Sequence, residues 1–319
     1  MRLRRACFLC LVGVVSLAGE VTILWPDVEQ GACMLVMGPE TEGVRVGILI
    51  DVGTGYSVAP EEPPTEAIGC LLAEDPRIQI KYTLLTHFHS DHYSWFLSLK
   101  ASGLLAPDCV EYTRYTVEPG QTIDLGSGAI LQVLVASGWA WTGAEKIQVT
   151  SASDENTLSV GGKISYGEFQ AWVGGDLTAT VEVKIASYIG DVDLYVLHHH
   201  GSHTSSSLTF LRALRLEVAV CQVGDGNPYG HPYSITLRNV LSTADTDGNP
   251  MNGTPLLILQ NRRSYAGGYS QVLVADPDGP GGSPGVIRLS TDGSSYAITI
   301  GTVTLTFSVD EITLSGSPR

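Results

Sequence analysis

The first part of the chain alternates between short apolar runs and turn-forming residues. Runs rich in β-branched and apolar side chains predict strands at 21–25, 34–37, 44–50 and 78–85. Apolar side chains recur at helical spacing at 66–74 and again within 93–105, where we expect helices. Strands and helices that alternate in this way are typical of an α/β sandwich.

The same alternation continues to about residue 245. Further strands are predicted at 110–117, 122–125, 130–136, 159–166, 168–174, 193–197 and 218–223. Helices are expected in the stretch that ends at 187, at 205–216 and after 229–233. The segment 138–142 carries two Trp residues and is interpreted as a loop near the mouth of a cleft.

The C-terminal part has a different pattern, without His or Cys. Residues 276–285 are rich in Pro and Gly and are typical of a linker, and 286–314 alternate as short strands. These strands form either a small β appendage or the last strands of the sandwich. The expected division is a signal peptide at 1–18, a hydrolase domain at 19–262 and a β-rich C-terminal extension at 263–319.

The strand predicted at 78–85 runs directly into Thr86-His87-Phe88-His89-Ser90-Asp91-His92. On an extended backbone His87 and His89 point the same way, and a turn can bring Asp91 and His92 to the same place. Imidazole and carboxylate are the ligands that Zn²⁺ and similar ions prefer, so this motif predicts a site for two neighbouring metal ions. All histidines of the chain lie in three short stretches: His87, His89 and His92; His198, His199, His200 and His203; and His231.

Two further carboxylates follow predicted strands directly. Asp51 comes at the end of the strand 44–50, and Asp176 follows Gly174 and Gly175. Every candidate ligand therefore sits just past the C-terminal end of a strand, where α/β sheets build their clefts.

The N-terminus combines a basic stretch, an apolar run from Ala6 to Leu17 and small residues at 16–18, which is typical of a signal peptide. We therefore expect a secreted or periplasmic protein that does not remain in the membrane after cleavage. Removing 1–18, which hold three Arg and no acid, would change the formal net charge from −15 to −18. Such a charge counts against tight non-specific DNA binding, so no stable nucleic-acid complex is expected. Among the remaining cysteines, Cys33, Cys70, Cys109 and Cys221, two disulfides with three possible pairings can form.

With these residues in view, the chain resembles the metallo-β-lactamase superfamily, through His87-x-His89-x-Asp91-His92 and the strand-end residues Asp51 and Asp176. It is most similar to the metallo-β-lactamase-like domain of ComEC-type DNA-uptake (competence) proteins. Four stretches carry that second likeness: Asp27-Val28-Glu29-Gln30-Gly31, Asn156-x-x-Ser159, His199-His200-Gly201-Ser202-His203-Thr204-Ser205-Ser206 and Tyr229-Gly230-His231-Pro232. Glu29 and Ala32-Cys33 depart from the family's first motif, and no His lies between His92 and His198.

The resemblance implies an αββα four-layer sandwich, of class α/β, with the small β-rich extension at its C-terminal end. It also implies two divalent metal ions: Zn²⁺ is the first expectation, and Mn²⁺ or Fe is admissible. The implied metal ligands are His87, His89, Asp91, His92, Asp176 and one residue of the pair His199 and His200, with His199 favoured. Asp51 would hold a ligand in orientation, and Asn156, Ser159, Ser202 and His231 would contact substrate.

The implied reaction is hydrolysis of a phosphodiester by a hydroxide that bridges the two metals, with Asp91 orienting it and His231 stabilising the phosphoryl oxygens. The family suggests a nuclease, and the acidic composition favours a small-molecule or short nucleic-acid substrate. One alternative is ring opening of a β-lactam or lactone, which the missing third-motif histidine disfavours. The other is a non-catalytic, metal-stabilised binding module.

Overall fold

The computed structural model describes residues 19–55, 63–224, 227–243, 256–260, 272–275 and 286–309. The expected signal peptide at 1–18 and the expected linker at 276–285 lie outside these residues. Among the residues described, no helix is both long enough and apolar enough to cross a membrane.

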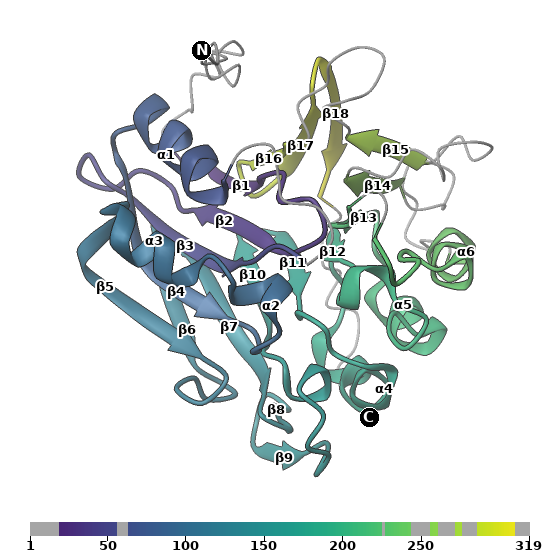
Figure 1. Cartoon of the computed structure of the whole chain (residues 1–319). Helices are drawn as coiled ribbons and strands as arrows, with labels where there is room; N and C mark the ends of the chain where they lie inside the picture. Colours follow the sequence, from purple (N-terminus) through teal and green to yellow (C-terminus); the bar gives the residue numbers. More distant parts are fainter. Residues whose placement is uncertain are drawn as a thin grey trace.

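Two mixed sheets face each other in the described part of the chain (Figure 1). The first has the order β18 (Val303–Ser308), β17 (Ser295–Ile300), β16 (Ile287–Thr291), β1 (Val21–Trp25), β2 (Cys33–Met37), β3 (Arg45–Val52), β4 (Ile78–Leu85) and β5 (Leu105–Thr113). The second has the order β15 (Val272–Ala275), β14 (Leu256–Gln260), β13 (Val218–Cys221), β12 (Leu194–Val196), β11 (Phe169–Val173), β10 (Gly161–Tyr166), β7 (Ala129–Ala136), β8 (Trp139–Trp141) and β9 (Lys146–Gln148). Strand β6 (Thr122–Gly126) also pairs with β7.

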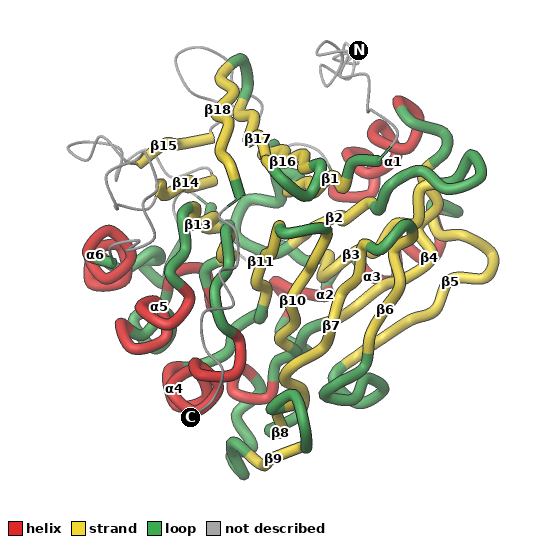
Figure 2. Tube along the Cα trace, turned by 180° about the vertical axis from the view of Figure 1, so that it is seen from behind, coloured by secondary structure: helices red, strands yellow, loops and turns green. Residues whose placement is uncertain are grey.

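Helices cover the outer face of each sheet, as Figures 1 and 2 show. The first sheet carries α1 (Pro64–Glu74), α2 (Ser90–Tyr93) and α3 (Phe96–Ser102); the second carries α4 (Ala179–Ile189), α5 (Leu208–Leu214) and α6 (Ser234–Ser242). Three buried apolar clusters match the three interfaces between four layers. One lies between the sheets, one joins the second sheet to α4–α6, and one joins the first sheet to α1 and α3. The predicted αββα sandwich is confirmed.

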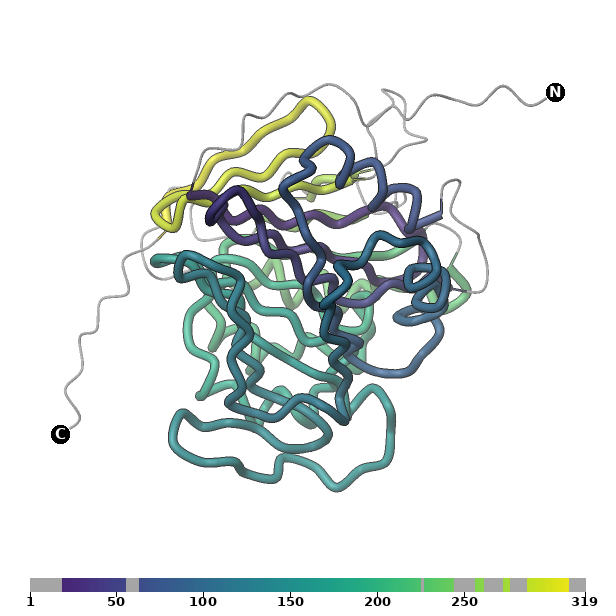
Figure 3. Tube along the Cα trace, turned by 90° about the vertical axis from the view of Figure 1, so that its left-hand side faces the viewer, coloured from purple at the N-terminus to yellow at the C-terminus, as the bar shows by residue number. Residues whose placement is uncertain are grey.

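Of the strand-rich C-terminal region, β16, β17 and β18 belong to the first sheet, whereas β15 pairs with β14 of the second sheet. Strand β16 pairs antiparallel with β1, with Val21 opposite Thr291 and Trp25 opposite Ile287. Figure 3 shows these yellow strands beside the purple N-terminal strands. Of the two interpretations left open for this region, the structure follows the one in which its strands complete the sandwich. The division at 262/263 stays a prediction.

The helix expected within 93–105 is present as α3, and just before it the Trp95 N–H donates to the carbonyl of Val52 and holds the chain against β3. One sequence prediction was wrong: the segment 138–142, expected as a loop, contains β8, which forms a hairpin with β9. Gly138 has a φ of +83°, and a Cβ there would meet the Thr150 carbonyl oxygen at 2.7 Å, so a glycine is required where β7 turns into β8.

The cysteines do not form the two disulfides that four of them could allow. Cys33, which is buried in β2, and Cys109 on β5 are both free thiols. Each of the three possible pairings uses all four cysteines, Cys33, Cys70, Cys109 and Cys221. Because Cys33 and Cys109 are free, none of the three pairings occurs.

A buried amide joins the two sheets. Gln222, which follows β13 of the second sheet, donates from Nε2 to the Cys33 carbonyl at 2.9 Å and accepts the Cys33 N–H through Oε1 at 3.3 Å. Gln222 is only 5% exposed, so water cannot replace these bonds.

We predict that Gln222→Leu lowers the free energy of unfolding by about 2 kcal/mol, because it leaves a buried N–H and carbonyl without partners. Urea denaturation would measure the loss, and Gln148→Leu on exposed β9 is the matched control. Equal stability of the two variants would contradict a bonding role for Gln222.

Candidate metal centre

The first side of the site is built where β4 ends. Thr86 donates to the carboxylate of Asp51 through its N–H at 2.8 Å and its hydroxyl at 2.7 Å, which ties the end of β4 to the end of β3. His87 follows and is fully buried. The short helix α2 then turns the chain back, so that His92, 1% exposed, lies beside His87 with a ring-centroid separation of 4.1 Å.

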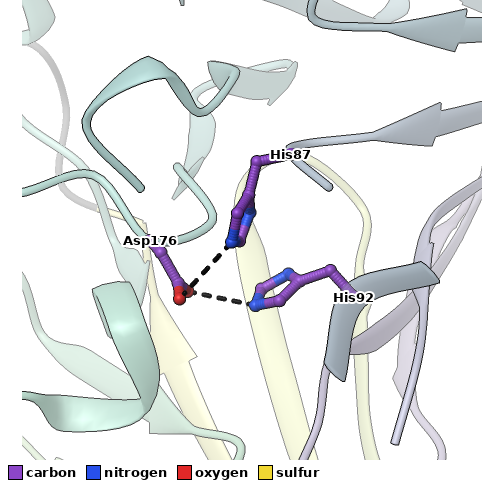
Figure 4. Close-up of side chains that lie close together, drawn as sticks. All are labelled: His87, His92 and Asp176. Carbon is purple, nitrogen blue, oxygen red and sulfur yellow. Dashed lines mark ion pairs between the residues drawn. The ribbon is translucent and has the colours of Figure 1, made fainter. Parts of the chain in front are cut away.

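The second sheet supplies Asp176 from the turn after β11. Gly175 has a φ of +51°, and a Cβ there would meet the Thr86 hydroxyl at 2.6 Å, so only glycine lets the two sheets approach this closely. The Asp176 N–H donates to Ser159 Oγ at 3.2 Å. His87 and His92 both point at the carboxylate (Figure 4): His87 Nε2 lies 3.6 Å from Oδ2, and His92 Nε2 lies 3.1 Å from Oδ1.

The pair His199 and His200 comes from the 3₁₀ turn at His198–Gly201, in left-handed conformation with φ of 54° and 52°. Both side chains reach the cluster. His200 Nε2 lies 3.2 Å from His92 Nε2 and 3.4 Å from Asp91 Oδ2, and His199 Nε2 lies 3.6 Å from Asp176 Oδ2. Of the two, His200 is the buried one, at 4% exposed.

Two groups of potential ligands result, and they share His92. One is His87, His92 and Asp176; the other is Asp91, His92 and His200; in each, the ligand atoms lie within 4.8 Å of one another. Their nitrogen and oxygen donors are the set that Zn²⁺, Mn²⁺ or Fe accepts.

The hydrogen bonds around the cluster leave the ligand atoms available. His92 donates from Nδ1 to Asp51 at 2.7 Å, and His200 donates from Nδ1 to the Gln222 carbonyl at 2.8 Å. In the neutral rings both Nε2 atoms then present lone pairs to each other, an arrangement that a cation stabilises. Among the described residues, His87 Nε2 is buried without a hydrogen-bond partner. The residues therefore fit a metal centre.

The electrostatics of the cluster also favour a cation. Burial alone would lower the pKa of His92, but the Asp176 and Asp51 carboxylates outweigh it and hold that pKa well above its ordinary value. Burial and the neighbouring His92 lower the pKa of His87 well below its ordinary value, so its ring is neutral and able to ligate. Burial would raise the pKa of Asp91, but its hydrogen bond with His200 and the charge of His92 lower it, which keeps the carboxylate ionised.

The remaining predicted site residues lie around this cluster at different depths. His89 is exposed, with its ring 4.8 Å from that of His87. Ser159 and Ser202 are buried; Ser159 supports Asp176, and Ser202 contacts the Thr204 hydroxyl at 2.9 Å.

His231 and Asn156 each hold a buried side-chain atom without a hydrogen-bond partner. His231 lies 5.4 Å from the His199 ring, and its Nδ1 is the atom without a partner; for Asn156 it is Oδ1. Burial, together with His200 and His199, lowers the pKa of His231 to about 3. His231 is therefore a neutral ring beside the cluster.

Sequence reasoning missed a buried network behind the 3₁₀ turn. His198 donates from Nδ1 to Glu182 at 2.7 Å and accepts the Trp172 indole N–H at 2.8 Å, and the Glu182 carboxylate accepts the backbone N–H groups of Ser206 and Ser207. The signal was a charged residue on the apolar face of α4, where Val181 and Ile185 are also buried. The network anchors the loop that presents His199 and His200.

The first motif of the resemblance, Asp27 to Gly31, leads directly into a contact with Asp91. Directly after it, the Ala32 N–H donates to the Asp91 carbonyl at 2.9 Å. Gly53 lies so close that a Cβ there would meet the Asp91 backbone at 2.3 Å. Glu29, where the sequence departs from the family pattern, has a φ of 56°. Its N–H donates to the Asp27 carboxylate at 2.9 Å.

Comparison with known proteins gives one family and several relatives. The sequence model of the Metallo-beta-lactamase superfamily matches residues 27–110. The chain is 29% identical over 258 residues to competence protein ComA of Neisseria gonorrhoeae, covering 75% of this chain and 33% of that protein. It is 31% identical over 149 residues to recombination protein 2 of Haemophilus influenzae, covering 42% of this chain and 19% of that protein.

The chain thus spans about a third and about a fifth of the lengths of these two relatives. Among solved structures, Zn²⁺-bound PqqB from Methylobacterium extorquens is similar, with 12% identity and a TM-score of 0.40 over 75% of this chain and 97% of that one.

We predict that Asp51→Asn weakens the affinity for a divalent metal by about tenfold to a hundredfold, because the carboxylate that orients His92 and the end of β4 is lost. Titration with Zn²⁺ or Mn²⁺, followed by calorimetry, measures this affinity without reference to activity. Asp124→Asn, at an exposed position of β6, is the control. An unchanged affinity in Asp51→Asn would rule out the orienting role.

Proposed function

Because this chain belongs to the metallo-β-lactamase superfamily and is a hydrolase of that fold, we propose that its reaction is the metal-assisted hydrolysis of a phosphodiester. The observation that carries the proposal is the pair of overlapping ligand groups, one with His87 and Asp176 and the other with Asp91 and His200. His92, common to both, can bind only one ion, because its Nδ1 is hydrogen-bonded to Asp51 and its Nε2 has a single lone pair. When bound there, two divalent ions, with Zn²⁺ as the first expectation, would lower the pKa of water and stabilise negative charge on the oxygen under attack.

The chain's own residues divide the remaining work. His87, Asp176, His92, Asp91 and one or both of His199 and His200 would hold the metals. Exposed His89 would complete the set at the mouth of the site. Asp51 would fix the ring of His92 through the 2.7 Å hydrogen bond from Nδ1.

Two groups beside the ligands would act on the substrate. The ionised Asp91 would accept a hydrogen bond from the attacking water and so orient it toward phosphorus. His231, at the edge of the cluster, would donate a hydrogen bond to a phosphoryl oxygen. Asn156 would contact the substrate through its amide, whose buried Oδ1 has no hydrogen-bond partner in the part of the chain that the structure describes.

The nature of the substrate is inferred from the relatives and from charge. The two curated relatives are named a competence protein and a recombination protein, which supports nucleic acid over a β-lactam or a lactone. The formal net charge of −15 disfavours long duplex DNA, since affinity for a duplex depends on neutralising its phosphates. We propose a short or small phosphodiester substrate that leaves after turnover.

Export of the protein belongs to the same proposal. The basic, apolar and small-residue pattern of 1–18 supports cleavage after Ala18, which would place the hydrolase outside the cytoplasm.

We predict that the protein loaded with Zn²⁺ or Mn²⁺ hydrolyses bis-p-nitrophenyl phosphate, and that His87→Ala lowers kcat/KM by at least about a hundredfold. Loss of a metal ligand should lower kcat/KM at least as much as loss of a residue that orients such a ligand. His203→Ala is the control, because that exposed ring packs on Tyr233.

A β-lactam and an acyl-lactone, assayed beside the diester, separate the alternatives. Ring opening without diester cleavage would replace the phosphodiesterase assignment with the lactamase or lactonase one. No turnover of any of the three by the metal-loaded protein would favour the binding module.

A further inference from the structure

A pocket lies beside the segment that carries His87 and His89, and none of the roles proposed above uses it. It has a volume of about 410 Å³, within the range of pockets that hold small molecules. Its lining includes Arg114, Tyr115, Glu118, Ser137, Trp139 and Lys146.

Strand register places this pocket beside the ligands. β4 and β5 are parallel neighbours, with Leu85 opposite Thr113. The residues that follow β5, Arg114 and Tyr115, therefore emerge beside the segment that carries the metal ligands. Direct contacts confirm the adjacency, because Phe88, between His87 and His89, stacks on the Tyr115 ring with centroids 5.6 Å apart.

Ion pairing fixes one wall of the pocket. Arg114 forms two 2.9 Å hydrogen bonds to the Glu155 carboxylate, and Glu155 also accepts the Phe88 N–H at 3.0 Å. The Arg114 guanidinium lies 4.0 Å from the centre of the Tyr115 ring. Ser137, which follows β7, donates from its hydroxyl to the Arg114 carbonyl at 2.6 Å, so the two walls are tied together.

Two aromatic rings of the pocket are open to solvent. Tyr115 is 68% exposed and Trp139 is 44% exposed. The neighbouring Trp141 differs, because it is partly buried and packs against the second core, with Gly120 beneath its ring. Large rings held open beside a hydrolytic centre are suited to stacking on a planar group of the substrate.

The charged side chains of the pocket are balanced, whereas the whole chain carries a formal net charge of −15. Arg114 pairs with Glu155, and Lys146 pairs with Glu118. Lys146 and Glu118 form an exposed ion pair at 2.7 Å, which a phosphate could enter at little cost because the pair is solvated. A planar ring that carries an anionic group matches both features.

We propose that this pocket is a nucleobase subsite, in which the base next to the scissile phosphodiester stacks on Trp139 and Tyr115 while Lys146 meets the adjoining phosphate. The assignment rests on the proposed function, since it names the substrate of the same site. A base in a duplex has both faces covered by its neighbours, so the substrate is a single strand or a dinucleotide.

The test compares two diesters that share one leaving group: the p-nitrophenyl ester of thymidine 5′-phosphate, which has a base, and methyl p-nitrophenyl phosphate, which has none. The measured quantity is the ratio of their kcat/KM values. Trp139→Ala is expected to lower this ratio roughly tenfold, mainly through KM for the thymidine diester, and Trp139→Phe is expected to retain most of it. Tyr188→Ala, at a 42% exposed position of α4, is the matched control.

Binding of fluorescein-labelled trithymidylate, measured by anisotropy, separates failure of the subsite from failure of the reaction. If neither diester turns over, the phosphodiesterase assignment fails. The subsite is still supported in that case if Trp139→Ala raises the Kd for trithymidylate. The subsite is overturned if the unchanged protein does not bind trithymidylate, or if Trp139→Ala alters neither the ratio nor the Kd.

Discussion

One buried carboxylate joins the two halves of this molecule. Asp176 comes from the second sheet and is 2% exposed, yet it lies within 4 Å of imidazole nitrogens from both sides of the sandwich. An isolated charge at this depth would cost several kcal/mol, so the fold tolerates it only with compensating positive charge nearby. The histidines supply part of that compensation, and a metal ion would supply the rest. The end of β11, which carries Asp176, must therefore lie close enough to the end of β4 for His87 and His92 to reach the carboxylate.

The backbone around the cluster is arranged to meet this constraint. His199 and His200 both adopt left-handed conformation, which costs about 1 kcal/mol or more for each non-glycine residue. Hydrogen bonds on both sides of the turn offset the cost: the His199 N–H donates to the Gly175 carbonyl, and Glu182 holds the N–H groups of Ser206 and Ser207. A loop fixed in this way presents its imidazoles before any ion arrives. Preorganisation of this kind favours tight and selective ligation.

The sequence was informative where function follows local chain geometry. His87, His92 and Asp176 could be proposed as ligands because each follows a strand whose pattern is clear. Their strands belong to different sheets, β4 to the first and β11 to the second, and the sandwich brings the two strand ends together. Gln222 and Glu182 could not be identified as partners, because their contacts involve residues far away in the chain. The loop expected at 138–142 was wrong because only the pairing of Trp139–Trp141 with β7 and β9 makes this short segment a strand.

The pairing of β1 with β16 has a consequence for how the protein is made. A ribosome releases residues 21–25 early, but their antiparallel neighbour, residues 287–291, is synthesised only after the rest of the metal-binding domain. Until then β1 presents an open edge, a feature that invites pairing with other chains. The first sheet thus reaches its full width only after residues 287–308 have been synthesised, and contacts this distant in sequence form slowly.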